Sequence, residues 1–175
     1  MKRLGLFRHA KSDWDDMALR DFDRGLNARG RKGAALMGAH IADYGAAWSM
    51  VLASPAERVR LTLDASGLGV PVTFEQRAYL ADSSALIDLL RAVDDSEPAV
   101  LLAGHNPGLH DLALELAAPN DEDGLLAKLE AKFPTAAFAV FELAIDRWQD
   151  LELGCGRLIH FARPRDIDPE LGPER

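Results

Sequence analysis

Residues 3–12 read RLGLFRHAKS, an apolar run that is followed at once by Arg8, His9, Lys11 and Ser12. The run from Arg3 to Phe7 has the length and the composition of a buried strand. In open α/β sheets, ligands bind where strands end and lead into the next helix. This stretch therefore predicts a first strand that delivers charged and polar side chains to one edge of a sheet.

Outward from this strand, apolar segments of strand length alternate with longer segments of helical period. Such alternation is typical of a layered α/β domain in which helices cover a largely parallel sheet. The expected strands are Arg3–Phe7, Met50–Ala53, Val70–Phe74, Ala99–Ala103, Ala137–Leu143 and Arg157–Phe161.

Helices are expected between these strands, and capping residues mark the start of the first two. The first follows Asn27, whose side chain is a good N-cap, and it ends near Gly45. The second follows Ser54 as its cap, with Pro55 in the first turn, where a missing N–H is harmless.

The later part of the chain predicts two more helices, a loop and a tail. The helices are expected over Ser84–Val93 and after Pro107–Gly108, and the polar, acidic segment Pro119–Gly124 predicts a loop. Residues 164–175 are rich in proline and charge and are expected to form a loosely ordered tail. No repeat or shift in composition marks a boundary, so residues 1–175 are expected to form a single domain.

Composition narrows the class of protein. The chain has 175 residues, of which 48% are hydrophobic, enough for one buried core. Its net charge of −8 argues against binding to nucleic acid or to an anionic membrane. The single cysteine, Cys155, cannot form an internal disulfide, and no apolar run has the length of a signal peptide core or a membrane span. A cytoplasmic location is therefore expected.

Three of the predicted strands are followed by residues suited to phosphate chemistry. Arg8 and His9 follow the first, Arg58 lies shortly after the second, and His105 lies in the segment GHNPG after the fourth. Guanidinium groups match phosphate oxygens in bidentate fashion, and a neutral imidazole is a nucleophile. With its other ring nitrogen held by a backbone carbonyl, His9 would present one nitrogen to phosphorus. The set therefore predicts phosphoryl transfer without a metal.

Each of these residues also has an ordinary structural interpretation. An isolated Arg-His pair carries little information, Arg58 on a helix can be solvated or salt-bridged, and His105 can hydrogen-bond its own turn. Their common placement at the ends of three strands is what favours a site.

The same segments resemble the histidine phosphatase superfamily, and within it the small SixA-type phosphohistidine phosphatases. The resemblance covers nearly the whole chain and is carried by Leu6–Ser12, Leu26–Gly30, Ala53–Arg58 with Thr62, and Ala103–Pro107. It implies a three-layer α/β/α sandwich around a mostly parallel mixed sheet of about six strands, as in phosphoglycerate mutase. It also implies a phosphohistidine intermediate on His9, phosphate contacts from Arg8 and Arg58, and His105 as a further positive partner. No cofactor is implied.

Several residues near the predicted site have two interpretations. Many relatives have glycine after the nucleophile, and Ala10 is tolerated there only if the backbone conformation is open to L-residues. Asp82 is the candidate general acid, and the alternative is that it caps the helix that follows. Lys11, Ser12 and Asn106 are candidate phosphate or substrate contacts, with a surface role or a turn role as the alternative.

The leading functional hypothesis is a phosphatase that acts on a phosphohistidine protein or a small phosphorylated metabolite. Two alternatives stay open: a phosphate-recognising module without turnover, and a phosphomutase that uses the same site. The oligomeric state is not predicted. The basic stretch from Arg20 to Lys32 is either a solvated face or a guide for a phosphorylated substrate or acidic partner.

Overall fold

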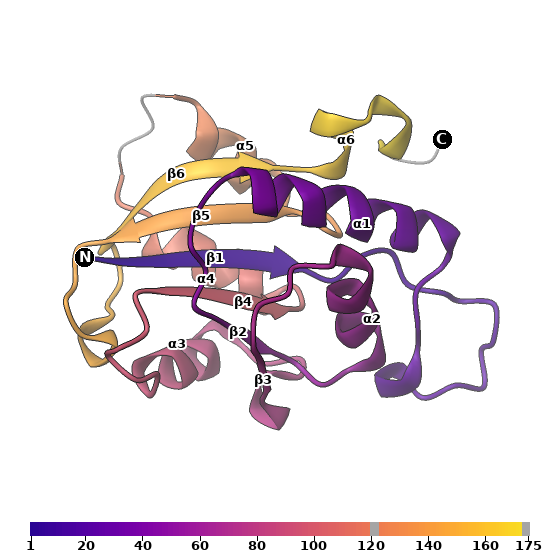
Figure 1. The fold of residues 1–175 in the computed structure, drawn as a ribbon, viewed down its shortest axis with the longest axis horizontal. Helices are drawn as coiled ribbons and strands as arrows, with labels where there is room; N and C mark the ends of the chain where they lie inside the picture. Colours follow the sequence, from indigo (N-terminus) through magenta and orange to yellow (C-terminus); the bar gives the residue numbers. More distant parts are fainter. Residues whose placement is uncertain (120–122, 173–175) are drawn as a thin grey trace.

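The computed structural model describes residues 1–119 and 123–172, which contain one six-stranded sheet (Figure 1). The strand order is β3-β2-β4-β1-β5-β6. The strands are β1 (Lys2–Arg8), β2 (Met50–Ala53), β3 (Val72–Phe74), β4 (Ala99–Gly104), β5 (Phe138–Leu143) and β6 (Gly156–Ala162). Each predicted strand is therefore present, with ends that differ by at most two residues.

The sheet is mixed, as the resemblance implied. Strands β3, β2, β4 and β1 run parallel to one another. Strand β5 pairs antiparallel with β1, and β6 pairs antiparallel with β5. The parallel strands β2, β4 and β1 are adjacent, so their carboxyl ends meet at one edge. This edge carries all three segments that the sequence singled out.

Helices cover both faces of the sheet, so the three-layer α/β/α prediction is confirmed. The helices are α1 (Ala28–Asp43), α2 (Glu57–Ser66), α3 (Ser83–Arg91), α4 (Gly108–Leu116), α5 (Leu125–Ala131) and α6 (Pro164–Ile167). The buried side chains of α1 and α2 pack in one hydrophobic cluster, and those of α3, α4 and α5 pack in another. Short 3-10 helices are η1 (Asp21–Asp23), η2 (Gln76–Ala78), η3 (Trp148–Asp150) and η4 (Pro169–Leu171).

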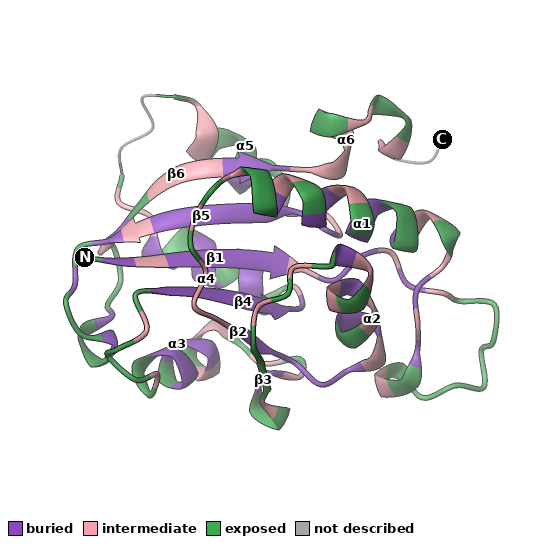
Figure 2. Ribbon diagram, in the orientation of Figure 1, coloured by how far each residue is buried: buried purple, intermediate pink, exposed green. Residues whose placement is uncertain are grey.

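The central strands are buried on both faces (Figure 2). Alternate residues of β1 point to opposite clusters: Leu4 and Leu6 pack with α3 and α4, and Phe7 packs with α1 and α2. This double burial explains why β1 and β4 read as continuous apolar runs rather than as alternating ones. It also fixes the sheet edge rigidly beneath the residues that follow each strand.

The start of α1 agrees with the sequence prediction, whereas the start of α2 differs. Asn27 caps α1 through a hydrogen bond from Gly30 N to its side-chain oxygen. A side chain at residue 30 would bring its Cβ within 2.1 Å of Lys11 O, so glycine permits the close approach of α1 to the end of β1. Ser54 is not the cap of α2, because the helix begins later, with Ala56 at the N-cap. The Ser54 hydroxyl is instead engaged by His105.

Two helical segments differ from the prediction: α5 directly follows the predicted loop, and α6 lies inside the predicted tail. Of the predicted loop Pro119–Gly124, residues 120–122 lie outside the described residues, and α5 begins directly after Gly124. The predicted tail differs from expectation, because Pro164–Ile167 form α6 and Arg29 donates hydrogen bonds to Glu170 O and Gly172 O. Within the described ranges, no helix is both long and apolar enough to span a bilayer.

Candidate active site

Three strand ends place the candidate residues side by side. The register pairs Arg8 of β1 with Gly104 of β4, so His9 and His105 leave neighbouring strands at the same level. The imidazole centroids of His9 and His105 are 5.3 Å apart. Arg58 enters from the first turn of α2, which follows β2 on the other side of β4.

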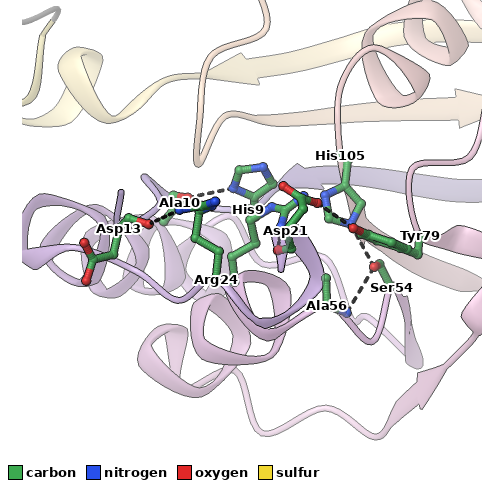
Figure 3. Close-up of polar contacts among 10 residues, drawn as sticks. His9, Ala10, Asp13, Asp21, Arg24, Ser54, Ala56, Tyr79 and His105 are labelled. Carbon is green, nitrogen blue, oxygen red and sulfur yellow. Dashed lines mark hydrogen bonds and ion pairs between the residues drawn. The ribbon is translucent and has the colours of Figure 1, made fainter. Parts of the chain in front are cut away.

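His9 is a buried imidazole with a defined tautomer. Its Nδ1 lies 2.7 Å from Ala10 O, and because a carbonyl only accepts, Nδ1 carries the proton and donates it (Figure 3). This agrees with the backbone-carbonyl contact expected from the sequence. Burial above all, opposed by this hydrogen bond and reinforced by the charge of Arg8, lowers the pKa of His9 to about 3. The ring is therefore neutral near pH 7, and Nε2 carries a lone pair.

His105 is held by Ser54. The two side chains meet at 2.8 Å between His105 Nε2 and Ser54 Oγ, and Ser54 Oγ also accepts a hydrogen bond from Ala56 N (Figure 3). Burial and the Arg58 charge lower the pKa of His105 to about 4. The resemblance implied a positive partner at this position. Burial and the Arg58 charge favour the neutral imidazole near pH 7, whereas a negatively charged phosphoryl group beside His105 would favour its protonated form.

Arg58 is buried and fixed by a carboxylate that the sequence analysis did not select. Its guanidinium donates to Asp21 O at 2.8 Å and pairs with Asp21 Oδ2 at 3.0 Å. Asp21 Oδ2 also accepts a hydrogen bond from the Tyr79 hydroxyl (Figure 3). Partial burial would raise the pKa of Asp21, but the hydrogen bonds from Tyr79 and Arg58 outweigh it and lower the pKa. Asp21 therefore stays ionised and orients the Arg58 fork.

Arg8 is held by a main-chain carbonyl. Its guanidinium donates to Phe133 O at 3.2 Å, and the Asn106 side-chain amide donates to the same carbonyl at 2.8 Å. Burial and the nearby Arg58 charge lower the pKa of Arg8. Within the described part of the chain, three buried polar atoms here have no hydrogen-bond partner: Arg8 Nε, His105 Nδ1 and Asn106 Oδ1.

Thr62 connects the His9 segment to α2. Its hydroxyl accepts a hydrogen bond from Ala10 N at 2.9 Å and donates one to Arg58 O at 2.6 Å. Ala10 is fully buried and is not among the residues with positive φ, so its backbone conformation suits an L-residue. The alanine that replaces glycine after His9 is therefore compatible with the site.

The remaining candidates lie apart from this group. Asp82 is exposed, and its carboxylate accepts from Ala85 N as the N-cap of α3, which was the alternative considered for it. Ser12 is buried and pairs in a short bridge with Leu26. Lys11 lines a cavity that lies beside the site. Asn106, by contrast, shares the Phe133 carbonyl with Arg8.

Sequence reasoning missed Asp21 and Tyr79. Both lie in segments without strong periodicity, and they meet because the Phe22 ring packs edge-on against Tyr79, with ring centroids 5.0 Å apart. The Tyr79 ring also packs against His105, at 5.5 Å between centroids. No local sequence pattern predicts such a contact. The only hint in the sequence is an acidic residue, Asp21, in a segment that the fold brings next to the buried Arg58.

The chemistry of this set suits an anion rather than a cation. Two guanidinium groups donate hydrogen bonds and do not ligate metals, and each buried imidazole sits among positive neighbours. A tetrahedral oxyanion between them would accept hydrogen bonds from Arg8 Nε and His105 Nδ1.

The depressed imidazole pKa values predict a loss of stability in weak acid. Because the pKa values of His9 and His105 lie below 6.5, the unfolded chain takes up protons at these residues at a higher pH than the folded chain does. The free energy of unfolding should be fully retained above pH 6.5 and should fall as the pH drops toward 4 and 3. Urea unfolding across this range should show a smaller loss for the double variant His9→Gln/His105→Gln than for the wild type. Equal losses of the free energy of unfolding in the two proteins would contradict the lowered pKa values of His9 and His105.

Comparisons with known proteins identify the family of this chain. Residues 4–84 match the family model of the histidine phosphatase superfamily, branch 1. An uncharacterized protein of Mycobacterium tuberculosis is 36% identical over 159 residues, which cover 90% of this chain and 99% of the relative. A similar relative from Mycobacterium leprae is 36% identical over 163 residues, with the same coverage of both chains.

Solved structures extend the similarity to the whole fold. A candidate phosphohistidine phosphatase SixA from Agrobacterium tumefaciens superposes with a TM-score of 0.75 and 32% identity, covering 93% of this chain and 98% of its own. Another from Nakamurella has a TM-score of 0.83 and 27% identity, covering 93% of this chain and 96% of its own. The family match, the near full-length relatives and the shared architecture lead to one conclusion: this chain belongs to the histidine phosphatase superfamily and is of the SixA type.

Proposed function

We propose that this chain is a phosphatase in which His9 takes up the phosphoryl group and then passes it to water. The observation that carries the proposal is the convergence of a neutral, tautomerically fixed His9 with two arginines and a second imidazole at one sheet edge. Membership of a phosphatase superfamily supports the reaction class.

The first step uses the free nitrogen of His9. Its Nε2 lone pair attacks phosphorus in line with the bond to the leaving group, and that bond breaks as the N–P bond forms. Arg8 and Arg58 hold the equatorial oxygens, where the charge is spread in the transition state. The dianionic phosphoryl group would also raise the pKa of His105, so this ring can donate a proton or share one with the phosphate.

The second step restores the enzyme. Water attacks the phosphorus of phosphohistidine, the N–P bond breaks, and inorganic phosphate leaves with the hydroxyl oxygen supplied by water. The hydrogen bond from Nδ1 to Ala10 O persists through both steps and keeps the reacting nitrogen aimed at the pocket. Arg8 and Arg58 supply two positive charges to the anion, so the proposal requires no divalent cation and no cofactor.

The leaving group is inferred from the carboxylates around the site. Asp82 is exposed and engaged in capping α3, and Asp21 is kept ionised by Arg58 and Tyr79. Neither is arranged as a strong proton donor, so a leaving group that departs readily is favoured. Phosphohistidine and aryl phosphates fit this requirement better than alkyl phosphates such as sugar phosphates. We therefore propose a phosphohistidine protein as the substrate class.

A panel of substrates tests the function. In the presence of EDTA, the protein should hydrolyse a phosphohistidine protein and an aryl phosphate, with a lower kcat/KM for small sugar phosphates. Inactivity on all three, or activity only after a divalent cation is added, would contradict the proposal. Isomerisation of a sugar phosphate would favour a mutase, and stoichiometric binding without release of phosphate would favour a recognition module.

A further inference from the structure

A basic cavity lies beside the active-site edge. It has a volume of about 260 Å³ and is enclosed by the end of β1, the start of α1, residues 132–136 and the C-terminal segment 163–172. We call it the basic pocket, after the six basic residues that line it: Arg8, Lys11, Arg29, Lys132, Arg163 and Arg165. These residues come from four separate segments of the chain, so the fold itself gathers them.

The charge of the basic pocket opposes that of the whole molecule. The chain carries 28 acidic and 20 basic residues, yet no acidic side chain lines this cavity among the residues that the structure describes. Bringing like charges together is unfavourable unless a counter-charge lies between them. A concave surface of one sign with low-dielectric walls focuses the field and attracts ions of opposite charge.

Several of the cations are oriented by uncharged groups. Arg8 donates to Phe133 O, and Arg29 donates to Glu170 O and to Gly172 O at 2.7 Å. Because a carbonyl oxygen is uncharged, the contact with Phe133 O fixes the Arg8 guanidinium without cancelling its charge. Asp166 partly neutralises Arg163 through an ion pair of 2.8 Å.

Two further cations add to the positive potential. Within the described ranges, neither Lys132 nor Arg165 takes part in an ion pair. Their charges are therefore available to a bound anion.

The volume and the walls restrict the ligand. The cavity is slightly smaller than the range of about 300 to 1,000 Å³ that is usual for drug-sized ligands. Its apolar lining comes from small side chains and one leucine: Ala10, Pro134, Ala136, Pro164 and Leu171. A compact group that carries two or three negative charges fits both the space and the potential.

The basic pocket and the phosphoryl site share Arg8. Arg8 and Ala10, which flank His9 in the chain, both line the pocket, whereas His9, Arg58 and His105 do not. The two regions therefore meet at Arg8 and are otherwise formed by different residues. We propose that the basic pocket is a second anion site, which binds a phosphate or carboxylate group distinct from the phosphoryl group that reacts at His9.

Calorimetry on the full-length chain tests the proposal with citrate and inorganic pyrophosphate as probes at low ionic strength. The variant Lys132→Ser/Arg165→Ser should weaken binding by at least about ten-fold, because two charge-assisted contacts are lost. The matched control Arg147→Ser/Arg157→Ser removes the same charge from surface ion pairs and should leave binding within about two-fold. Arg58→Ala should leave citrate binding largely unchanged. Absence of binding to the wild type, or equal weakening in both double variants, would overturn the proposal.

Kinetics distinguish the two sources of such an anion. Phosphohistidine peptides with glutamate or glutamine beside the phosphorylated residue should differ in KM if the pocket takes an acidic group of the substrate. The variant Lys132→Ser/Arg165→Ser should then abolish this difference. Equal KM values together with citrate binding that is lost in the same variant would identify a free small anion as the ligand. The calorimetric result stands whether or not the chain hydrolyses any phosphate, so failure of the proposed function is recognised separately.

Discussion

Replacing His9 with alanine is expected to reduce kcat/KM for an aryl phosphate on the order of 10⁴-fold or more. Removal of a nucleophile abolishes the covalent route and leaves only the charge stabilisation that the arginines provide. The measurement is initial-rate kinetics with enzyme concentrations high enough to quantify the residual rate. The cavity left by the imidazole is small, and the backbone contacts of the segment are retained, so the variant should fold.

His40→Ala is the matched control for this variant. His40 lies on α1, where its Nε2 contacts His160 Nε2 at 2.8 Å, far along the helix from the candidate site. Its removal should leave kcat/KM within about three-fold of the wild type, because its ring contacts His160 and Phe138 rather than the candidate site residues. Hydrolysis by His9→Ala at near the wild-type rate would show that another group attacks phosphorus.

Arg58→Ala is expected to lower kcat/KM by about 10³-fold, because one guanidinium supplies two charge-assisted donors to the phosphoryl oxygens. Arg58→Lys should recover only part of this loss, since an ammonium keeps the charge but lacks the planar fork.

The ion pair with Asp21 adds a further expectation. Asp21→Asn should raise KM more than it lowers kcat, because it loosens the orientation of Arg58 without removing its charge.

Arg60→Ala serves as the control on the same helix. The Arg60 guanidinium donates to Pro55 O and lies over the Phe74 ring at 4.0 Å, away from the site. Circular dichroism and thermal unfolding of all four variants separate a lost catalytic contact from a lost fold. An Arg58→Ala variant that is folded and as active as Arg60→Ala would exclude Arg58 from the phosphate site.

The strands were predictable because their burial is reflected in the apolar composition of their segments. β1 and β4 are covered on both faces, so each reads as an unbroken apolar run that ends in polar residues. The edge strand β3 is exposed, and its prediction began two residues too early. α5 was missed because it is only seven residues long and follows an acidic segment, and α6 because it is only four residues long and begins with a proline.

The candidate site was predictable only in part. Strand-end reasoning selected Arg8, His9, Arg58 and His105, and the structure brings these residues together. It did not select Asp21 or Tyr79, because the contact that joins their loops is tertiary. The lowered pKa of His105 was also beyond the sequence, because it depends on burial, which no local pattern reports. Ser54 was predicted as the N-cap of α2, whereas its hydroxyl contacts His105. Serine side chains serve in both roles, so the residue type alone does not distinguish them.

The covalent step at His9 is the claim on which the mechanism depends. Wild-type protein mixed with a ³²P-labelled phosphohistidine protein or aryl phosphate, and quenched in base within one turnover, should carry label that is stable to alkali and labile to acid. Mass spectrometry should place that label on His9, and the Arg58→Ala variant should accumulate it more slowly. Steady hydrolysis with no labelled protein, or label on another residue, would contradict the account.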